Sequence, residues 1–410
     1  MAVSACGDDG IDYDGTAGEP TPARFDAWVP AIDLSAASGD LDITGNVIVD
    51  TGAPFTILDV DTYGYEDGKA ATTLTGFGLT FPDYPVIAYD VFDQSTGDYD
   101  GLLGGDLLRH FALSLDYKGS LAWLRDADTT ALPSGVSGSF DDAVSIPFVL
   151  RGGGTGLVPG NCPGGCGTVS VAATRILLEV ELEGSATPVW FLVDTGASIS
   201  VLSEELLQEL GDPARPRLDG VSVATVNGIV SAYLSRVSSI VIAGDGEDAG
   251  PSQVTHVSSP VLVVPGWDLF GAIQSETGVQ VRGLIGGSFL RSFLTTLDYT
   301  SKRLRLSRYV EPSHLDPDEF VRVGFTLSPV SGQWRVVDVY DNTDAEAEGL
   351  VAGDVVLEID GTAITGLDES AVGNLLGAFG QGQEVPIGIQ VGGGVQTVDV
   401  MIEDLLPAYE

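Results

Sequence analysis

A five-residue phrase, Val-Asp-Thr-Gly-Ala, occurs twice in the chain, at residues 49–53 and again at residues 193–197. Each copy follows an apolar run typical of a β-strand. Each copy is also followed, further along the chain, by two apolar residues and two glycines, at 102–105 and at 284–287. One carboxylate in such a turn would say little, but two copies in one chain indicate two aspartates that face each other.

The similarity extends beyond the aspartates. After each glycine pair comes a short helix-like pattern and then a strand that ends in Leu-Asp-Tyr, at residues 106–117 and 288–299. Asp106 and Ser288 are good N-cap residues for these helices. The sequence therefore predicts an internal duplication.

Length and composition favour a mainly β protein. At 410 residues the chain is long enough for two to four domains, and it carries 54 glycines between many runs of Val, Ile, Leu and Thr. We predict a flexible tether at 1–23, two duplicated β units at 24–135 and 142–308, and a β-rich unit with one or two helices at 310–405.

The acidic balance excludes one class of partner. With 59 acidic and 18 basic residues, the formal charge is −41, so the chain repels phosphate backbones and we expect no nucleic-acid partner. Such charge suits solubility in a salty or extracytoplasmic environment; binding of a cationic partner is the alternative. Apolar stretches are too short for a membrane-spanning helix.

The cysteines bear on the compartment. Cys162 and Cys166 lie in a glycine-rich loop that could close a small disulfide, which implies an oxidising compartment; two free thiols are the alternative. A metal site would need two further ligands, and none lies nearby, so no metal is expected.

Residues 3–6, Val-Ser-Ala-Cys, resemble the lipobox of bacterial lipoproteins, in which Cys6 would be acylated. The charged and apolar parts of a signal peptide are missing before it. The resemblance implies an extracytoplasmic protein (periplasm, outer membrane or cell surface) that touches a membrane only through a lipid on Cys6.

Residues 25–308 resemble the aspartic peptidases, and the Asp-Thr-Gly-Ala wording is closest to the retropepsin-like branch, here with two lobes fused. The resemblance implies a pair of β-barrel lobes with a dyad of Asp50 and Asp194 that shares one proton and activates a water, with no cofactor. Four further residues would support the dyad loops, two as a cross-lobe lock and two as close-approach glycines: Thr51, Gly52, Thr195 and Gly196.

Two residue choices near the aspartates bear on the pH optimum and on whether the first loop is catalytically competent. Ala53 and Ala197 stand where acid-acting relatives often carry a hydroxyl, which would lower the pKa of the pair. We therefore expect an optimum that is mildly acidic to neutral. Pro54 replaces the hydroxyl-bearing residue of the second copy, Ser198, and could perturb the first loop.

A peptidase of this kind needs a flap that excludes water. Residues 221–230 read as a hairpin with Asn227 and Gly228 at its tip, near where the family places its flap. The first lobe has a shorter segment between its aspartate and its glycine pair, so we expect one flap, on the second lobe. An ordinary surface hairpin is the alternative.

The C-terminal unit carries a Gly-Leu, Gly-Asp, Asp-Gly series at 349–350, 353–354 and 360–361 and resembles a PDZ domain of the bacterial protease-associated kind. The resemblance implies that Val323, Gly324 and Phe325 form the loop that captures the C-terminal carboxylate of a peptide. A structural domain that packs on the peptidase or gates it is the alternative.

The expected function is an aspartic endopeptidase acting on a peptide or protein substrate, with the PDZ domain selecting or regulating that substrate. The competing hypothesis is a catalytically silent scaffold that binds peptides through its PDZ domain. A third is that lobes pair between chains rather than within one.

Overall fold

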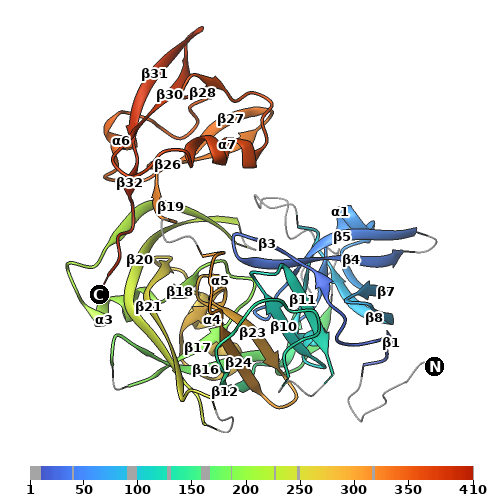
Figure 1. Cartoon of the computed structure of the whole chain (residues 1–410). Helices are drawn as coiled ribbons and strands as arrows, with labels where there is room; N and C mark the ends of the chain where they lie inside the picture. Colours follow the sequence, from blue (N-terminus) through green and yellow to red (C-terminus); the bar gives the residue numbers. More distant parts are fainter. Residues whose placement is uncertain are drawn as a thin grey trace.

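The computed structural model describes residues 11–38, 41–89, 99–126, 131–157, 167–185, 187–225, 228–246, 250–315 and 319–409. It has two closed β-barrels, a sheet shared between them and a separate C-terminal β domain above the second barrel (Figure 1). The prediction of a mainly β chain is confirmed.

The first lobe is a ring of six strands. Strand β7 pairs with both β4 and β8, which closes the sheet into a barrel. In ring order the strands are β4 (Val29–Ser38), β5 (Leu41–Val49), β9 (Gly101–Leu103), β6 (Ile57–Leu58), β8 (Leu79–Ala88) and β7 (Gly68–Gly76).

The second lobe repeats this ring, closed by pairing of its first and last strands. In the same order the strands are β16 (Arg175–Leu182), β17 (Val189–Val193), β22 (Val281–Ile285), β18 (Ser200–Leu202), β21 (Gln253–Val263) and β20 (Gly228–Ala243). One further strand, β19 (Arg217–Thr225), pairs with β20 as a long hairpin. Among the described strands of the first lobe, β19 has no counterpart, in line with the prediction of a hairpin on the second lobe alone.

A six-stranded sheet joins the lobes. Its central pair is β10 from the first lobe and β23 from the second, antiparallel, with Ser114 opposite Thr296. In order its strands are β12 (Val144–Pro147), β24 (Arg303–Arg308), β23 (Phe293–Asp298), β10 (Ala112–Asp116), β11 (Leu121–Arg125) and β2 (Thr21–Pro22). One hydrophobic core runs through both lobes and this sheet, so the lobes form one body.

Short helices and edge strands complete the two lobes. The helices are α1 (Val60–Tyr63), α2 (Gly105–Leu108), α3 (Glu204–Leu210), α4 (Leu269–Thr277) and α5 (Gly287–Leu290), and the remaining strands are β1 (Asp14–Gly15), β3 (Arg24–Asp26), β13 (Val149–Arg151), β14 (Gly154–Leu157) and β15 (Thr168–Val171). No described helix is both long and apolar enough to cross a membrane.

The tether prediction was wrong from residue 11 onward. Strand β1 pairs with β8, and β2 pairs with β11. Tyr13 packs its ring against Phe81 and Phe111 of the first lobe, with centroids 6.1 and 5.4 Å away. The polar composition of this segment concealed two short edge pairings anchored by one aromatic ring. Residues 1–10 lie outside the described residues.

The C-terminal domain has its own core, made of residues between Val323 and Ile402. Its elements are β25 (Val321–Arg322), β26 (Phe325–Val330), β27 (Gln333–Val339), α6 (Asp344–Ala347), β28 (Val356–Ile359), β29 (Thr362–Ala363), α7 (Glu369–Leu376), β30 (Glu384–Val391), β31 (Gly394–Met401) and β32 (Glu403–Asp404). The predicted Asp-Gly turn joins β28 to β29, with Asp360 and Gly361 both at positive φ.

The chain on either side of this domain is anchored on the second lobe. Phe320, Leu405 and Leu406 lie in a hydrophobic cluster with lobe residues such as Leu262 and Leu284. Both ends of the domain are therefore fixed to the lobe that carries the long hairpin.

Candidate active site

The two Asp-Thr-Gly loops begin where β5 and β17 end. Each of these strands pairs in parallel with the strand that leads into a glycine pair, β9 or β22. The pairing continues one residue further, because the Asp50 N–H donates to the Leu103 carbonyl and the Asp194 N–H donates to the Ile285 carbonyl, both at 3.0 Å. The apolar pair ahead of each glycine pair thus fixes the start of each loop.

The threonines lock the two loops together reciprocally. The Thr51 N–H donates to Thr195 Oγ1 at 3.0 Å, and the Thr195 N–H donates to Thr51 Oγ1 at 3.1 Å. Each hydroxyl then donates to the strand before the opposite loop, Thr51 to the Val193 carbonyl at 2.9 Å and Thr195 to the Val49 carbonyl at 2.5 Å. Both threonines are fully buried. Since all four bonds lie within one chain, the lobes pair intramolecularly.

The glycines bring each loop against the opposite aspartate. A Cβ on Gly52 would lie 2.4 Å from Asp194 Oδ1, and a Cβ on Gly196 would lie 2.6 Å from Asp50 Cγ. Real side chains do not approach this closely, so only glycine fits either position. The structure therefore brings the two aspartates together across the interface between the lobes.

The two carboxylates differ in their hydrogen bonds. Asp50 Oδ1 accepts from the Gly52 N–H at 2.7 Å and from the Ala53 N–H at 3.1 Å. Asp194 Oδ1 accepts from the Gly196 N–H at 3.0 Å. Backbone donors favour the ionised form of a carboxyl, so Asp50 is the better placed of the two to carry the charge.

The pKa shifts agree with that assignment. Burial raises the pKa of both aspartates. The negative charge of Asp50 and its hydrogen bond then raise the pKa of Asp194 further, to about 8, whereas the hydrogen bond with Asp194 and the loop N–H groups limit the rise at Asp50. The pair therefore shares one proton near neutral pH, and the loop hydrogen bonds favour Asp194 as the member that carries it.

Arg175, at the start of β16, adds a positive charge near the dyad that sequence analysis missed. Its charge lowers the pKa of both aspartates. Glu276 accepts three hydrogen bonds from the guanidinium: Nε donates to Oε1 at 3.1 Å and to Oε2 at 3.3 Å, and Nη2 donates to Oε2 at 3.0 Å. No local pattern around residue 175 signals this role, because the proximity arises only from closure of the barrel.

Asp106 and Ser288 are not N-caps, so that prediction was wrong. The helices α2 and α5 begin one residue earlier, after Gly104 and Gly286. The two side chains instead reach a hydroxyl six positions after each dyad aspartate. Thr56 Oγ1 donates to Asp106 Oδ1 at 2.8 Å, and Ser288 Oγ donates to Ser200 Oγ at 3.3 Å.

Thr56 and Ser200 also connect each dyad loop to its glycine pair. The Gly104 N–H donates to Thr56 Oγ1 at 3.2 Å, and the Gly286 N–H donates to Ser200 Oγ at 3.1 Å. A hydroxyl at the same offset in both copies was a visible signal for this role. These residues support the loops and do not touch the dyad carboxyls.

One backbone bond between loop and helix is the same in both copies despite Pro54. The Gly105 N–H donates to the Ala53 carbonyl at 2.8 Å, and the Gly287 N–H donates to the Ala197 carbonyl at 2.8 Å. The second loop has a further bond, from the Ser288 N–H to the Ser198 carbonyl at 2.8 Å, and the described first loop has no such bond from Asp106 to Pro54.

The other predicted site residues lie in the hairpin of the second lobe, in the C-terminal domain, or outside the described residues. Gly228 opens β20 and pairs with Thr225 of β19. Asn227, Cys6, Cys162 and Cys166 lie outside the described residues.

The predicted carboxylate loop lies in the C-terminal domain. Val323 and Phe325 are buried and line a groove. The carbonyl of Gly324 accepts from the Tyr340 N–H at 2.9 Å, and a Cβ on this glycine would collide with Thr343. Across the part of the chain that the structure describes, no group of three or more His, Cys, Asp and Glu side chains could hold a metal ion.

Two closed barrels with one Asp-Thr-Gly loop each, joined by a shared sheet, define a two-lobed protein of the aspartic-protease class. Residues 178–289 match the family model described as aspartyl protease, and residues 321–402 match the PDZ domain model. The chain thus combines an aspartyl-protease-like body with a PDZ domain.

Nothing among curated proteins matches the chain. Among solved structures, an aspartic proteinase from Irpex lacteus aligns at 16% identity and a TM-score of 0.41, over 71% of this chain and 97% of that one. An aminopeptidase N family protein from Idiomarina loihiensis aligns at 26% identity and a TM-score of 0.18, over 20% of this chain and 14% of that one. At these TM-scores neither alignment defines the fold.

Proposed function

We propose that the protein is an aspartic endopeptidase in which Asp50 and Asp194 hydrolyse a peptide bond. The observation that carries the proposal is the pair of unequal aspartates, held face to face by the threonine lock. A degenerate scaffold would have no need for the two glycines that admit the opposite carboxyl at such short range.

The chemistry follows from the single shared proton. Ionised Asp50 takes a proton from a water held between the carboxyls, and that water attacks the scissile carbonyl carbon. Protonated Asp194 donates its proton to the carbonyl oxygen as the tetrahedral intermediate forms. As the intermediate collapses and the C–N bond breaks, Asp50 passes the proton that it took from water to the leaving amine, and a hydroxyl of the intermediate returns a proton to Asp194. The pair is then back in its starting state, with no covalent enzyme intermediate.

The hairpin of β19 and β20 supplies the flap in this proposal, and the PDZ domain selects or regulates the substrate. The hairpin is the one large addition to the second barrel relative to the first. A cover over the dyad excludes bulk water and grips the substrate backbone, which an exposed carboxyl pair could not do alone.

The test is a cleavage assay with a mixed peptide library from pH 3 to pH 8. We expect cleavage by the parent protein and its loss in both Asp50→Asn and Asp194→Asn. Asp61→Asn, an exposed aspartate of α1, serves as the matched control and should cleave normally. No cleavage by a folded parent at any pH would favour the silent peptide-binding scaffold instead.

We also propose an extracytoplasmic location, with a disulfide between Cys162 and Cys166 and a lipid on Cys6. The acidic composition supports a salty or extracytoplasmic setting. Mass spectrometry of the protein from its native host would test all three, since free thiols at 162 and 166 and an unmodified Cys6 would contradict the proposal.

A further inference from the structure

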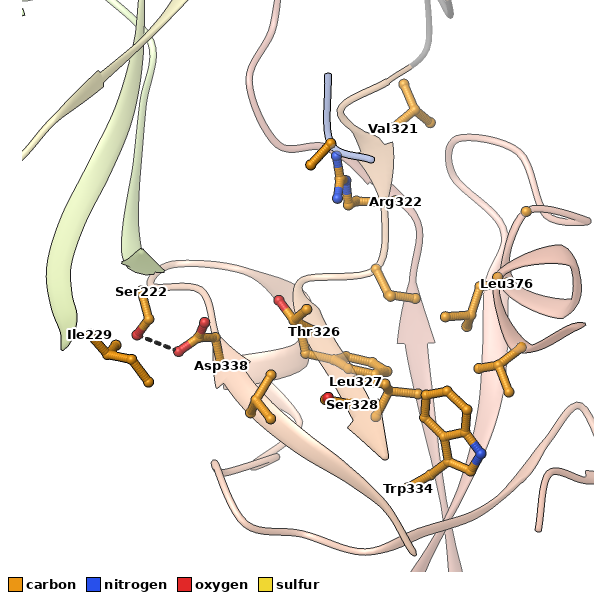
Figure 2. A pocket seen from close by; sticks show the side chains of 17 residues that line it. Ser222, Ile229, Val321, Arg322, Thr326, Leu327, Ser328, Trp334, Asp338 and Leu376 are labelled. Atoms are coloured by element: carbon orange, nitrogen blue, oxygen red, sulfur yellow. Dashed lines mark hydrogen bonds between the residues drawn. The ribbon is translucent and has the colours of Figure 1, made fainter. Parts of the chain in front are cut away.

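A groove of about 850 Å³ lies where the PDZ domain meets the two lobes. Most of its lining comes from the PDZ domain, between strand β26 and helix α7. Three lining residues do not: Ser222 and Ile229 belong to the flap hairpin, and Ala27 belongs to the first lobe. Figure 2 shows Ile229 and Ser222 beside Asp338 and Thr326 at one end of the groove.

The flap hairpin is bonded to the PDZ domain at this wall. Ser222 Oγ donates to Asp338 Oδ1 at 2.8 Å, and the Asp341 N–H donates to the Asp219 carbonyl at 3.3 Å. At Gly220, whose φ is +79°, a Cβ would lie 2.9 Å from the Val339 carbonyl oxygen. Strands β19 and β27 therefore approach as closely as their backbones allow, and a shift of one must move the other.

The first lobe reaches the same place through the turn between β3 and β4. Ala27 and Trp28 both have positive φ, at 46° and 70°. Trp28 Nε1 donates to Glu319 Oε1 at 3.3 Å, and the guanidinium of Arg291 lies 4.1 Å from the Trp28 ring centre. Since Glu319 immediately precedes the PDZ domain and bonds to Arg291 of the second lobe, this contact joins all three parts of the chain.

The groove fits the C-terminal end of a polypeptide. Among the described strands, β26 pairs with β27 alone, so its other edge can accept an added strand. Apolar side chains from Leu327, Val372 and Leu376 line the floor. Arg322, directly before the carboxylate loop, forms no ion pair within the described part of the chain and donates to the Glu319 carbonyl, which leaves its charge for an incoming carboxylate.

The last described residues of the chain itself lie elsewhere. The Tyr409 hydroxyl donates to Asp212 Oδ2 at 2.7 Å, and the Tyr409 N–H donates to Ser258 Oγ at 2.9 Å, both on the second lobe. The apolar floor and the charge of Arg322 fit a polypeptide with an apolar last residue and a free carboxylate, and we take this as the occupant.

We propose that the peptidase flap forms one wall of the PDZ groove, so that a chain end bound there is held by Ile229 as well as by the PDZ domain. Ile229 is 60% exposed and lines the groove, so a chain end that fills the groove can contact its side chain. Occupancy of the groove then stabilises the flap in the position seen here. Because coupling between two binding sites is reciprocal, a groove ligand changes the affinity of the dyad cleft for its substrate, and a ligand at the dyad changes affinity at the groove by the same factor.

The binding half of this proposal can be tested without catalysis, in full-length Asp50→Asn protein. The probe is the tightest member of a fluorescent decapeptide library ending in Val, Leu, Ile or Phe with a free carboxylate. We expect Ile229→Ser to weaken binding roughly fivefold, because covered apolar area is lost. Val257→Ser, on β21 of the same lobe and 69% exposed, is the matched control and should bind normally.

Arg322→Gln should remove the preference for the free carboxylate over the amidated peptide. Equal affinity of Ile229→Ser and the parent protein for the decapeptide would overturn the proposal that Ile229 forms part of the groove. A library in which no peptide binds would overturn it too.

The coupling half depends on the proposed peptidase function. The readout is kcat/KM for a quenched substrate with an amidated end, with and without saturating decapeptide. We expect a change of about threefold or more in wild type, no change with amidated decapeptide, and no change in Ile229→Ser.

The two ways to fail are distinguishable. Cleavage by wild type that ignores the bound decapeptide would overturn the coupling and leave the peptidase intact. No cleavage by wild type at all would overturn the peptidase, while the binding measurements would still decide whether Ile229 belongs to the groove.

Discussion

At the scale of single residues, the dyad is an unequal pair made from a repeated phrase. Asp50 and Asp194 occupy the same position in duplicated loops, yet Asp50 accepts two loop N–H groups and Asp194 accepts one. The difference is one hydrogen bond, from Ala53. It is enough to assign the charge to one partner and the proton to the other, and so to give the two aspartates different chemical roles.

This assignment predicts the alkaline limit of activity. Asp194 must be protonated for the pair to act, and its pKa is raised to about 8 by burial and by the charge of Asp50. Activity should therefore persist through neutral pH and fall as pH rises through about 8. A pH profile of kcat/KM measures this limb directly, and a profile that peaks below about pH 3 would contradict the prediction.

A hydroxyl beside Asp194 should move that limb. In Ala197→Thr, the added hydroxyl can donate to the carboxylate and stabilise its ionised form, which lowers the pKa of Asp194. We expect the alkaline limb to shift to lower pH by roughly one unit. Ala197→Val adds the same bulk without a donor, and a shift of equal size in that variant would show that bulk and not hydrogen bonding is responsible.

At the scale of elements, the two dyad loops stabilise each other across the interface between the lobes. Each threonine hydroxyl accepts a backbone N–H and donates to a carbonyl across the interface. Both threonines are fully buried, so loss of one hydroxyl leaves one buried N–H donor and one buried carbonyl acceptor on the opposite lobe without a partner.

Thr195→Val tests the lock because it keeps the shape and removes the hydroxyl. The Thr51 N–H and the Val49 carbonyl would lose their partner, and we expect the free energy of unfolding to fall by about 1–3 kcal/mol for each stranded group. Activity should fall more steeply than stability, since the aspartates depend on the loop position. Thr195→Ser retains the bonds and should stay close to wild type in both thermal melts and cleavage assays.

At the scale of the whole molecule, the two lobes are one folding unit, with the PDZ domain attached at the flap side. The core is continuous across the shared sheet, and Ser114 Oγ and Thr296 Oγ1 meet at its centre, 2.8 Å apart. The PDZ domain has a separate core. Heat should therefore unfold the body as a single transition, distinct from the PDZ domain.

The central hydroxyl pair gives a measurable coupling between the lobes. Ser114→Ala and Thr296→Val should each destabilise the body by about 1–2 kcal/mol, because each leaves one buried hydroxyl without its partner. The double variant should cost less than the sum of the two. Strict additivity in a double-mutant cycle would mean that the pair does not couple the lobes.

The sequence predicts those parts of the structure whose local geometry requires particular residue types at fixed positions. The duplication, the dyad, the lock and the close-approach glycines could all be predicted, because the lock needs a hydroxyl directly after each aspartate and the close approach needs a glycine directly after that. Arg175 could not, since its nearness to the dyad depends on barrel closure and not on its neighbours in sequence. Asp106 and Ser288 were misassigned because a polar residue in the first turn of a helix resembles an N-cap, although the true N-caps, Gly104 and Gly286, lie two positions earlier.

The shared sheet has a consequence for synthesis. Strand β10 is translated long before β23, its antiparallel partner, since Ser114 and Thr296 are 182 residues apart. At typical ribosomal rates the nascent first lobe would wait roughly 10 to 40 s for the strand that covers its edge. During that interval β10 is an open, mostly apolar edge, able to pair with a neighbouring nascent chain. Production of this protein should therefore depend on how crowded its ribosomes are, and slower initiation should raise the yield of correctly paired lobes.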